Sequence, residues 1–218
     1  MAIIDFLANI GGFFTNIHII FYIISYLLGG IPFGMLLAKK FANVNVKDDG
    51  SKSIGATNVL RVVKEKDPKL AKKLAVATVV LDALKGVVPL GVATILGFDV
   101  SALWMIGIMA IIGHCFSPYL GFEGGKGVAT GAGVMLFLQP IETLIAVVVW
   151  FIVAKGLKIS SLSSLAALAA LFLALFFRYG TIPEVNSFTP LVVIAFIIVY
   201  KHIPNIIRLI KKEEKRVV

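Results

Sequence analysis

The fold of this chain depends on one stretch, residues 128–154, which reads VATGAGVMLFLQPIETLIAVVVWFIVA. The stretch is apolar on both sides of a short polar interruption, QPIE at residues 139–142. It fits either one long helix or two short helices joined at that interruption. The choice decides how many times the chain crosses a membrane and on which side each loop lies.

The composition indicates a membrane protein. The chain has 218 residues, of which 59% are hydrophobic and 15% are charged, and its mean hydropathy is +0.97. Soluble domains carry about 25% charged residues, so the composition excludes a soluble protein. The length allows roughly six to eight spans of ~20 residues and leaves no room for a separate soluble domain. We therefore expect an all-α, polytopic protein with a single membrane-integral domain over residues 1–218.

Five further apolar runs are candidate spans. They are residues 18–38, 74–96, 102–120, 159–177 and 188–201. The first is interrupted near its end by a Gly-Gly-Ile-Pro sequence at 29–32, where proline removes a backbone donor. Residues 1–16 are largely apolar but short, which indicates an interfacial segment or a partial span. The single cysteine, Cys115, excludes an internal disulfide.

The formal net charge of +9 resolves the ambiguity at residues 128–154. Lysine and arginine concentrate in a polar loop at 39–73, a short turn at 155–158 and a tail at 202–218. The positive-inside rule places all three in the cytoplasm. From an outside N-terminus, this requires that residues 128–154 cross twice. We expect about seven transmembrane helices, N-out and C-in. No basic helix or aromatic platform lies outside the apolar runs, so nucleic acid is not an expected partner.

Two glycine-rich segments then lie on the cytoplasmic side, at residues 50–58 and 121–127. Successive small residues let backbone N–H groups converge on an anion, and a helix that begins there adds its positive end. Lys126, within the second segment, supplies a point charge suited to phosphate. Neither segment has the spacing of a Walker loop. The alternative is that both are flexible turns between helices.

Several polar residues interrupt the apolar runs. Asp82 and Lys85 are three residues apart and share one helix face, so they form an ion pair or line a polar cavity. His114 comes just before the second glycine-rich segment, where it is either an interfacial histidine or a site residue.

The start of the sixth apolar segment and the end of the last carry a further group. His202 and Asn205 are three residues apart, and Arg208 follows one turn later. This face either extends into the headgroups or directs a proton acceptor, an amide and a guanidinium at the glycine-rich segments. Ser161 and Ser164 are helix-start residues or pocket hydroxyls.

The ordered motifs resemble one family, the bacterial acyl-phosphate:glycerol-3-phosphate acyltransferases. The matching segments are IPFG at 31–34, GATNVLR at 55–61, DALKG at 82–86, GH at 113–114 with GGKGVAT at 124–130, and His202, Asn205-Ile206 and Arg208-Leu209. They run in order from Tyr26 to Glu214, and the ordered set is highly specific. None of the three histidines is followed by the His-x-x-x-x-Asp spacing of another large acyltransferase class.

The resemblance implies a seven-helix enzyme of the bacterial inner membrane that performs the first step of phospholipid biosynthesis. It would move a fatty acyl group from acyl phosphate to the 1-hydroxyl of glycerol 3-phosphate, giving lysophosphatidic acid and phosphate. The implied partners are both substrates, the lipid bilayer and the enzyme that forms the acyl phosphate. No cofactor or metal is expected.

The expected site follows from the matching positions. The catalytic residues would be His202, Asn205 and Lys126. The substrate-binding residues would be Lys47, Gly50, Ser51, Ser53, Gly55, Thr57, Asn58, Lys85, His114, Gly124, Gly125, Ser161 and Ser164. Segment 50–58 would hold the acyl phosphate, and Lys126 would attract the phosphate of the acceptor. No nucleophile–base–orienter triad is present, so we expect direct transfer, with the departing phosphate or His202 accepting the proton.

Four positions depart from the family pattern. Gly30 stands where the family has serine, Lys47 where it has arginine, and Lys52-Ser53 where it has Gly-Asn. Lysine lacks the bidentate fork of arginine. These departures leave open an acyltransferase paralogue with a different acceptor. The interrupted apolar runs and the Asp82–Lys85 pair leave open a non-enzymatic membrane transporter or lipid-binding protein.

Overall fold

The computed structural model describes residues 16–183 and 185–216, and this part of the chain is helical without strands. The expected interfacial segment at 1–16 lies outside the described residues, except for Asn16. The helices are α2 (Ile17–Gly30), α3 (Phe33–Ala42), α4 (Ala56–Lys64), α5 (Pro68–Ile95), α6 (Val100–Cys115), the 3-10 turn η1 (Pro118–Leu120), α7 (Val128–Leu138), α8 (Pro140–Leu157), α9 (Ser160–Tyr179) and α10 (Thr189–Ile210).

The prediction that residues 128–154 form two helices is confirmed. Helix α7 ends at Leu138, and α8 begins with Pro140 as its first residue. Gln139 between them has φ −139° and ψ 69°, because the proline ring disfavours helical geometry in the preceding residue. Six segments are long and apolar enough to span a membrane, and α7 is a shorter apolar helix. Together they give the expected seven-helix arrangement.

The first span runs over Ile17–Ala42 and is broken into α2 and α3 at the predicted Ile31-Pro32 step. The Ile31 carbonyl at this break accepts a hydrogen bond from Lys85 Nζ at 3.0 Å. A backbone carbonyl freed at membrane depth therefore has a partner from α5, as such a site requires.

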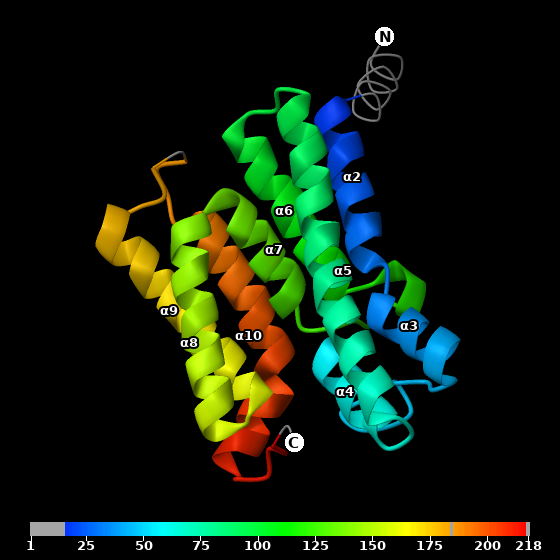
Figure 1. The fold of residues 1–218 in the computed structure, drawn as a ribbon. Coiled ribbons are helices and arrows are strands. Elements are labelled where there is room, and N and C mark those ends of the chain that lie inside the picture. Colours follow the sequence, from blue (N-terminus) through cyan, green and yellow to red (C-terminus); the bar gives the residue numbers. More distant parts are fainter. Residues whose placement is uncertain (1–15, 184, 217–218) are drawn as a thin grey trace.

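Two groups of helices lie on either side of α7. Figure 1 shows α2, α5 and α6 in one group and α8, α9 and α10 in the other, with α7 between them. Glycines allow the closest approaches. A Cβ at Gly113 would overlap the Tyr26 carbonyl oxygen, and one at Gly133 would overlap the carbonyl oxygen of Ala83. Small residues at these contacts are typical of packing within membranes.

The polar segment at 39–73, expected to be a loop, contains helical structure. It holds α4 and the first turn of α5, where the Asp67 carboxylate accepts hydrogen bonds from the N–H groups of Lys69 and Leu70. The apolar side chains of Val59 and Val63 on α4 are buried and form a second small core with residues of α3 and α5. The high content of charged residues in this segment predicted a loop and gave no indication of the short amphipathic helix α4.

The basic segments share one end of the molecule. In Figure 1 the region of α4, the turn between α8 and α9, and the C-terminal end lie together, opposite the N-terminal end. Helix α10 continues to Ile210, so the first part of the predicted tail is helical. Phosphate-binding residues predicted from four separate segments can therefore converge at this end.

Candidate active site

The loop before α4 is organised by one buried side chain, Asn58. Its Oδ1 accepts a hydrogen bond from Ser51 N at 2.8 Å, and its Nδ2 donates to the carbonyls of Val46 at 2.8 Å and Ser53 at 2.9 Å. Gly50 has φ +66°, and a Cβ there would overlap Asn58 Oδ1. Asn58 therefore shapes the loop from inside and is only 1% exposed.

The same loop connects to the start of α9. The hydroxyls of Thr57 and Ser160 lie 2.9 Å apart. Gly55 is the N-cap of α4, and its own N–H donates to Ser53 Oγ at 3.3 Å. Within the described residues no side chain caps the N-terminus of α4. Its first N–H groups can therefore serve an anion.

The second glycine-rich segment packs over the end of α6. Gly125 N donates to the His114 carbonyl at 3.0 Å, and a Cβ at Gly125 would overlap the Nε2 of His114. A Cβ at Gly124 would likewise overlap the His114 carbonyl oxygen. These two glycines allow the loop to lie flat on α6, which positions Lys126. Lys47 Nζ pairs with Glu123 Oε2 at 3.0 Å, so an ion pair joins the chain just before the first glycine-rich segment to the second one.

The carboxylate of Glu214 binds two of the predicted site residues, Ser161 and Asn205, together with Arg208. Ser161 Oγ donates to Glu214 Oε1 at 2.7 Å, Asn205 Nδ2 donates to the same oxygen at 2.6 Å, and Arg208 Nε donates to Oε2 at 2.6 Å. We call Ser161, Asn205 and Arg208 the donor set. They come from the start of α9 and the end of α10, and together they bind both oxygens of one anion.

Lys126 adds a positive charge to this region. Its partial burial lowers its pKa to about 8, the charge of Glu214 opposes this shift, and the charges of Arg208 and Arg61 add to it. Burial alone would raise the pKa of Glu214, but the hydrogen bonds from the donor set outweigh it and hold that pKa below its ordinary value. Near neutral pH the site therefore contains an ionised carboxylate surrounded by cations and donors.

His202 lies one turn before Asn205 on α10 and is 1% exposed. Its Nδ1 lies 2.7 Å from the Ile198 carbonyl oxygen. A carbonyl oxygen can only accept, so Nδ1 carries the hydrogen and Nε2 of the neutral ring keeps its lone pair. The positive charge of Lys126 interacts electrostatically with the His202 ring. His202 therefore has the tautomer that a proton acceptor needs.

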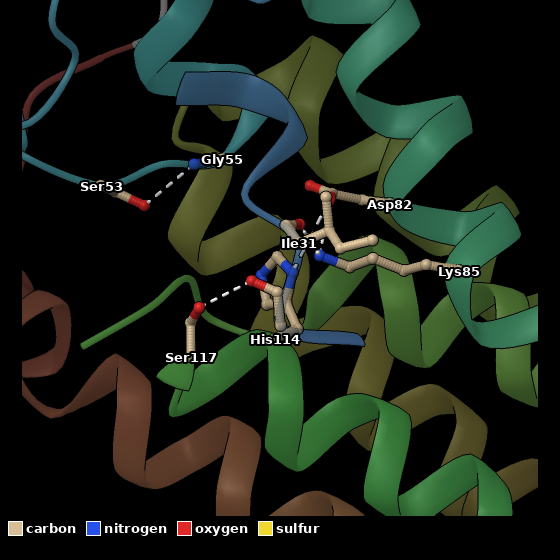
Figure 2. Close-up of polar contacts among 8 residues, drawn as sticks. Ile31, Ser53, Gly55, Asp82, Lys85, His114 and Ser117 are labelled. Carbon is tan, nitrogen blue, oxygen red and sulfur yellow. Dashed lines mark hydrogen bonds and ion pairs between the residues drawn. The ribbon is translucent and has the colours of Figure 1, made fainter. Parts of the chain in front are cut away.

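Asp82, Lys85 and His114 form a separate buried group (Figure 2). Lys85 Nζ lies 2.9 Å from Asp82 Oδ1, and His114 Nδ1 lies 3.8 Å from the same oxygen. All three residues are 5% exposed or less. The structure thus contains the mutual ion pair of Asp82 and Lys85 considered from the sequence. Substrate contacts of Lys85 and His114 stay predictions.

Ser164 differs from Ser161. Its hydroxyl donates to the Ser160 carbonyl at 3.0 Å and accepts from Trp150 Nε1 at 3.3 Å. It therefore binds its own helix and α8, one turn away from the donor set.

The structure brings together Lys126, Ser161, His202 and Asn205. It places Thr57 beside Ser160, and keeps Lys47 at the exposed edge.

Sequence reasoning missed Glu214. The residue lies in a basic tail without periodicity, and its position depends on a reversal of the chain at Lys212, where φ is +59°. The packing around Gly30 explains why glycine stands where the family pattern has serine. A Cβ at this position would lie 2.8 Å from Pro118 Cδ and 3.2 Å from the Tyr119 ring, so the packing favours glycine.

Comparisons with known proteins identify the family of this chain. The family model described as glycerol-3-phosphate acyltransferase matches residues 19–212. A glycerol-3-phosphate acyltransferase of a Nitratiruptor species is 63% identical over 205 residues, covering 94% of this chain and 98% of the relative. The corresponding protein of Campylobacter lari is 59% identical, covering 92% of this chain and 99% of the relative.

A solved structure has the same fold. The crystal structure of PlsY, an integral membrane glycerol 3-phosphate acyltransferase, in its glycerol 3-phosphate form has a TM-score of 0.79 and 36% identity, covering 91% of this chain and 94% of that one. A second form of PlsY, with lysophosphatidic acid, has a TM-score of 0.78 at the same identity and coverage. These matches cover nearly the full length of this chain and of each relative. The chain is therefore an enzyme, and the alternative of a non-enzymatic transporter or lipid-binding protein is wrong. The chain belongs to the glycerol-3-phosphate acyltransferase family of integral membrane acyltransferases.

Proposed function

We propose that this enzyme transfers a fatty acyl group from acyl phosphate to the 1-hydroxyl of glycerol 3-phosphate. The products are lysophosphatidic acid and inorganic phosphate. The forms in which PlsY was solved support this acceptor and this product for the present chain.

The observation that carries the proposal is the binding of one carboxylate by the donor set. Carboxylate and phosphate oxygens accept the same charge-assisted hydrogen bonds, and arginine suits both. The acceptor's phosphate would bind Ser161, Asn205 and Arg208, with Lys126 as an additional cation. This arrangement would leave the glycerol hydroxyls within the site.

The acyl phosphate would bind at the loop before α4. The uncapped N-terminus of α4 favours its phosphate. The Thr57–Ser160 contact keeps this loop beside α9, next to the donor set. The acyl chain would extend into the bilayer. Holding two anions side by side lowers the entropic barrier to their reaction.

The reaction would then be a direct displacement. The 1-hydroxyl oxygen attacks the acyl carbon, the bond from that carbon to the phosphate oxygen breaks, and phosphate leaves with the bonding electron pair. The hydroxyl proton passes to the departing phosphate or to His202 Nε2, which has a free lone pair in the neutral ring.

We place this site at the cytoplasmic face of the bacterial inner membrane, with the N-terminus outside. The basic segments gathered at the same end support this orientation. A separate enzyme at that face would supply the acyl phosphate.

The test is a reconstituted assay. Purified enzyme in detergent is mixed with palmitoyl phosphate and glycerol 3-phosphate, and phosphate and lysophosphatidic acid are both measured. We expect equal amounts of the two products. Phosphate release that does not depend on glycerol 3-phosphate, or that occurs only with another acceptor, would overturn the proposal.

A further inference from the structure

The C-terminal tail inserts its own anion into the acceptor site. After α10 ends at Ile210, Lys212 N donates to the Leu209 carbonyl at 3.1 Å, and Glu213 N donates to the Arg208 carbonyl at 2.8 Å. These bonds reverse the chain and direct the Glu214 side chain to Ser161 on α9. The side chain of Glu214 is only 11% exposed, whereas residues 211–213 around the turn are exposed.

The carboxylate and a substrate phosphate cannot occupy the donor set together. The Ser161 hydroxyl has one hydrogen, and the Nε of Arg208 has one. Both hydrogens point to Glu214 oxygens at 2.7 and 2.6 Å. A phosphate placed within hydrogen-bond distance of the same donors would also bring two negative charges into contact.

We propose that Glu214 is an internal competitor for the phosphate of glycerol 3-phosphate. This inference rests on the proposed function, since it identifies the donor set as the acceptor's phosphate site. In the free enzyme the carboxylate holds Ser161, Asn205 and Arg208 in a geometry ready for an anion. The acceptor binds by displacing it, so Glu214 sets the acceptor affinity.

The structure allows this displacement at small cost. Within residues 211–216, the side chain of Glu214 is the one that is not exposed, and the turn before it is held to α10 by backbone hydrogen bonds. No helix has to move for the carboxylate to leave the site. The released carboxylate reaches water, where it regains hydration.

The experiment compares Glu214→Gln with Glu213→Gln. The two substitutions remove the same charge from adjacent positions, but Glu213 is exposed and has no side-chain contact among those found in the described residues. Steady-state kinetics with palmitoyl phosphate measure KM for glycerol 3-phosphate and kcat separately. Binding of glycerol 3-phosphate alone is measured by isothermal titration calorimetry in detergent. Glu214→Ala provides a second variant.

We expect Glu214→Gln and Glu214→Ala to lower KM and the dissociation constant of glycerol 3-phosphate about fivefold, because a larger fraction of molecules has an open site. Glu213→Gln should match the parent in KM, kcat and the dissociation constant. Unchanged or weaker binding in both Glu214 variants would overturn the inference. A large fall in kcat with unchanged KM would overturn it too, since Glu214 would then position the donor set for catalysis. Tighter binding without turnover in any variant or the parent would support the inference and contradict the proposed function.

Discussion

At the scale of single residues, the site depends on charges held where they are only partly hydrated. Lys126 has a pKa of about 8, set first by burial and modified by Glu214, Arg208 and Arg61. Its charge is therefore present at neutral pH and is lost within the range where the enzyme can be assayed. An arginine at the same position would stay charged throughout.

This pKa predicts a specific pH profile. A lysine binds phosphate as a cation, so kcat/KM for glycerol 3-phosphate should fall as pH rises above about 8. Phosphate itself has a second pKa of about 6 and stays dianionic there. Lys126→Arg should remove the alkaline fall. A parent profile that is flat for a full pH unit above the lysine pKa would contradict this assignment.

The Asp82–Lys85 pair makes a prediction about stability. Lys85→Met should leave the buried Asp82 carboxylate unpaired and lower the free energy of unfolding by about 3–5 kcal/mol. It also removes the donor to the Ile31 carbonyl. The double variant Asp82→Asn with Lys85→Met should recover much of the loss. Thermal unfolding in detergent measures both, and an unchanged melting temperature in the single variant would show that the pair contributes little.

At the scale of elements, some helices and breaks could be predicted from the sequence and others could not. The division of residues 128–154 into two helices was predictable from a proline and from the distribution of charge among the loops, and the break at Ile31-Pro32 was predictable from its proline. The helix α4 was not, since its buried valines alternate with polar residues that include Arg61 and Lys64. Glu214 was not predictable because its contact with Ser161 joins residues 53 positions apart through a chain reversal.

Asn58 is the residue on which the loop before α4 depends. Asn58→Ala removes its donors from the carbonyls of Val46 and Ser53 and should destabilise the loop by about 1–3 kcal/mol. We expect KM for acyl phosphate to rise more than KM for glycerol 3-phosphate. Asn45→Ala is the matched control, because Asn45 is exposed and bonds only locally to Asp48 and Lys47. Equal kinetics of the two variants would contradict the role given to Asn58.

At the scale of the whole molecule, the fold gathers residues from α4, α9, α10 and the glycine-rich loop at one end of the bundle. The same end carries the basic segments. In the proposed orientation, the charge that would orient the chain in the membrane and the charge that would attract phosphate substrates lie on one face. This proposal would account for a net charge of +9 on so apolar a chain.

The orientation can be tested with single cysteines, because the native Cys115 is 0% exposed. Lys215→Cys lies in the C-terminal tail, and Pro183→Cys lies in the exposed turn between α9 and α10 at the opposite end. In intact cells an impermeant maleimide should label only Pro183→Cys. Permeabilised cells should show labelling of both, and the reverse pattern in intact cells would contradict the N-out, C-in orientation.

The central claim is that the acceptor's 1-hydroxyl attacks the acyl carbon of acyl phosphate. It is tested most directly with glycerol 3-phosphate carrying oxygen-18 in that hydroxyl, incubated with palmitoyl phosphate and the purified enzyme. Mass spectrometry should find the label in the ester of lysophosphatidic acid and none in the released phosphate. Label in a glycerol bisphosphate, which attack at phosphorus would form with release of the fatty acid, or the absence of lysophosphatidic acid, would contradict the account.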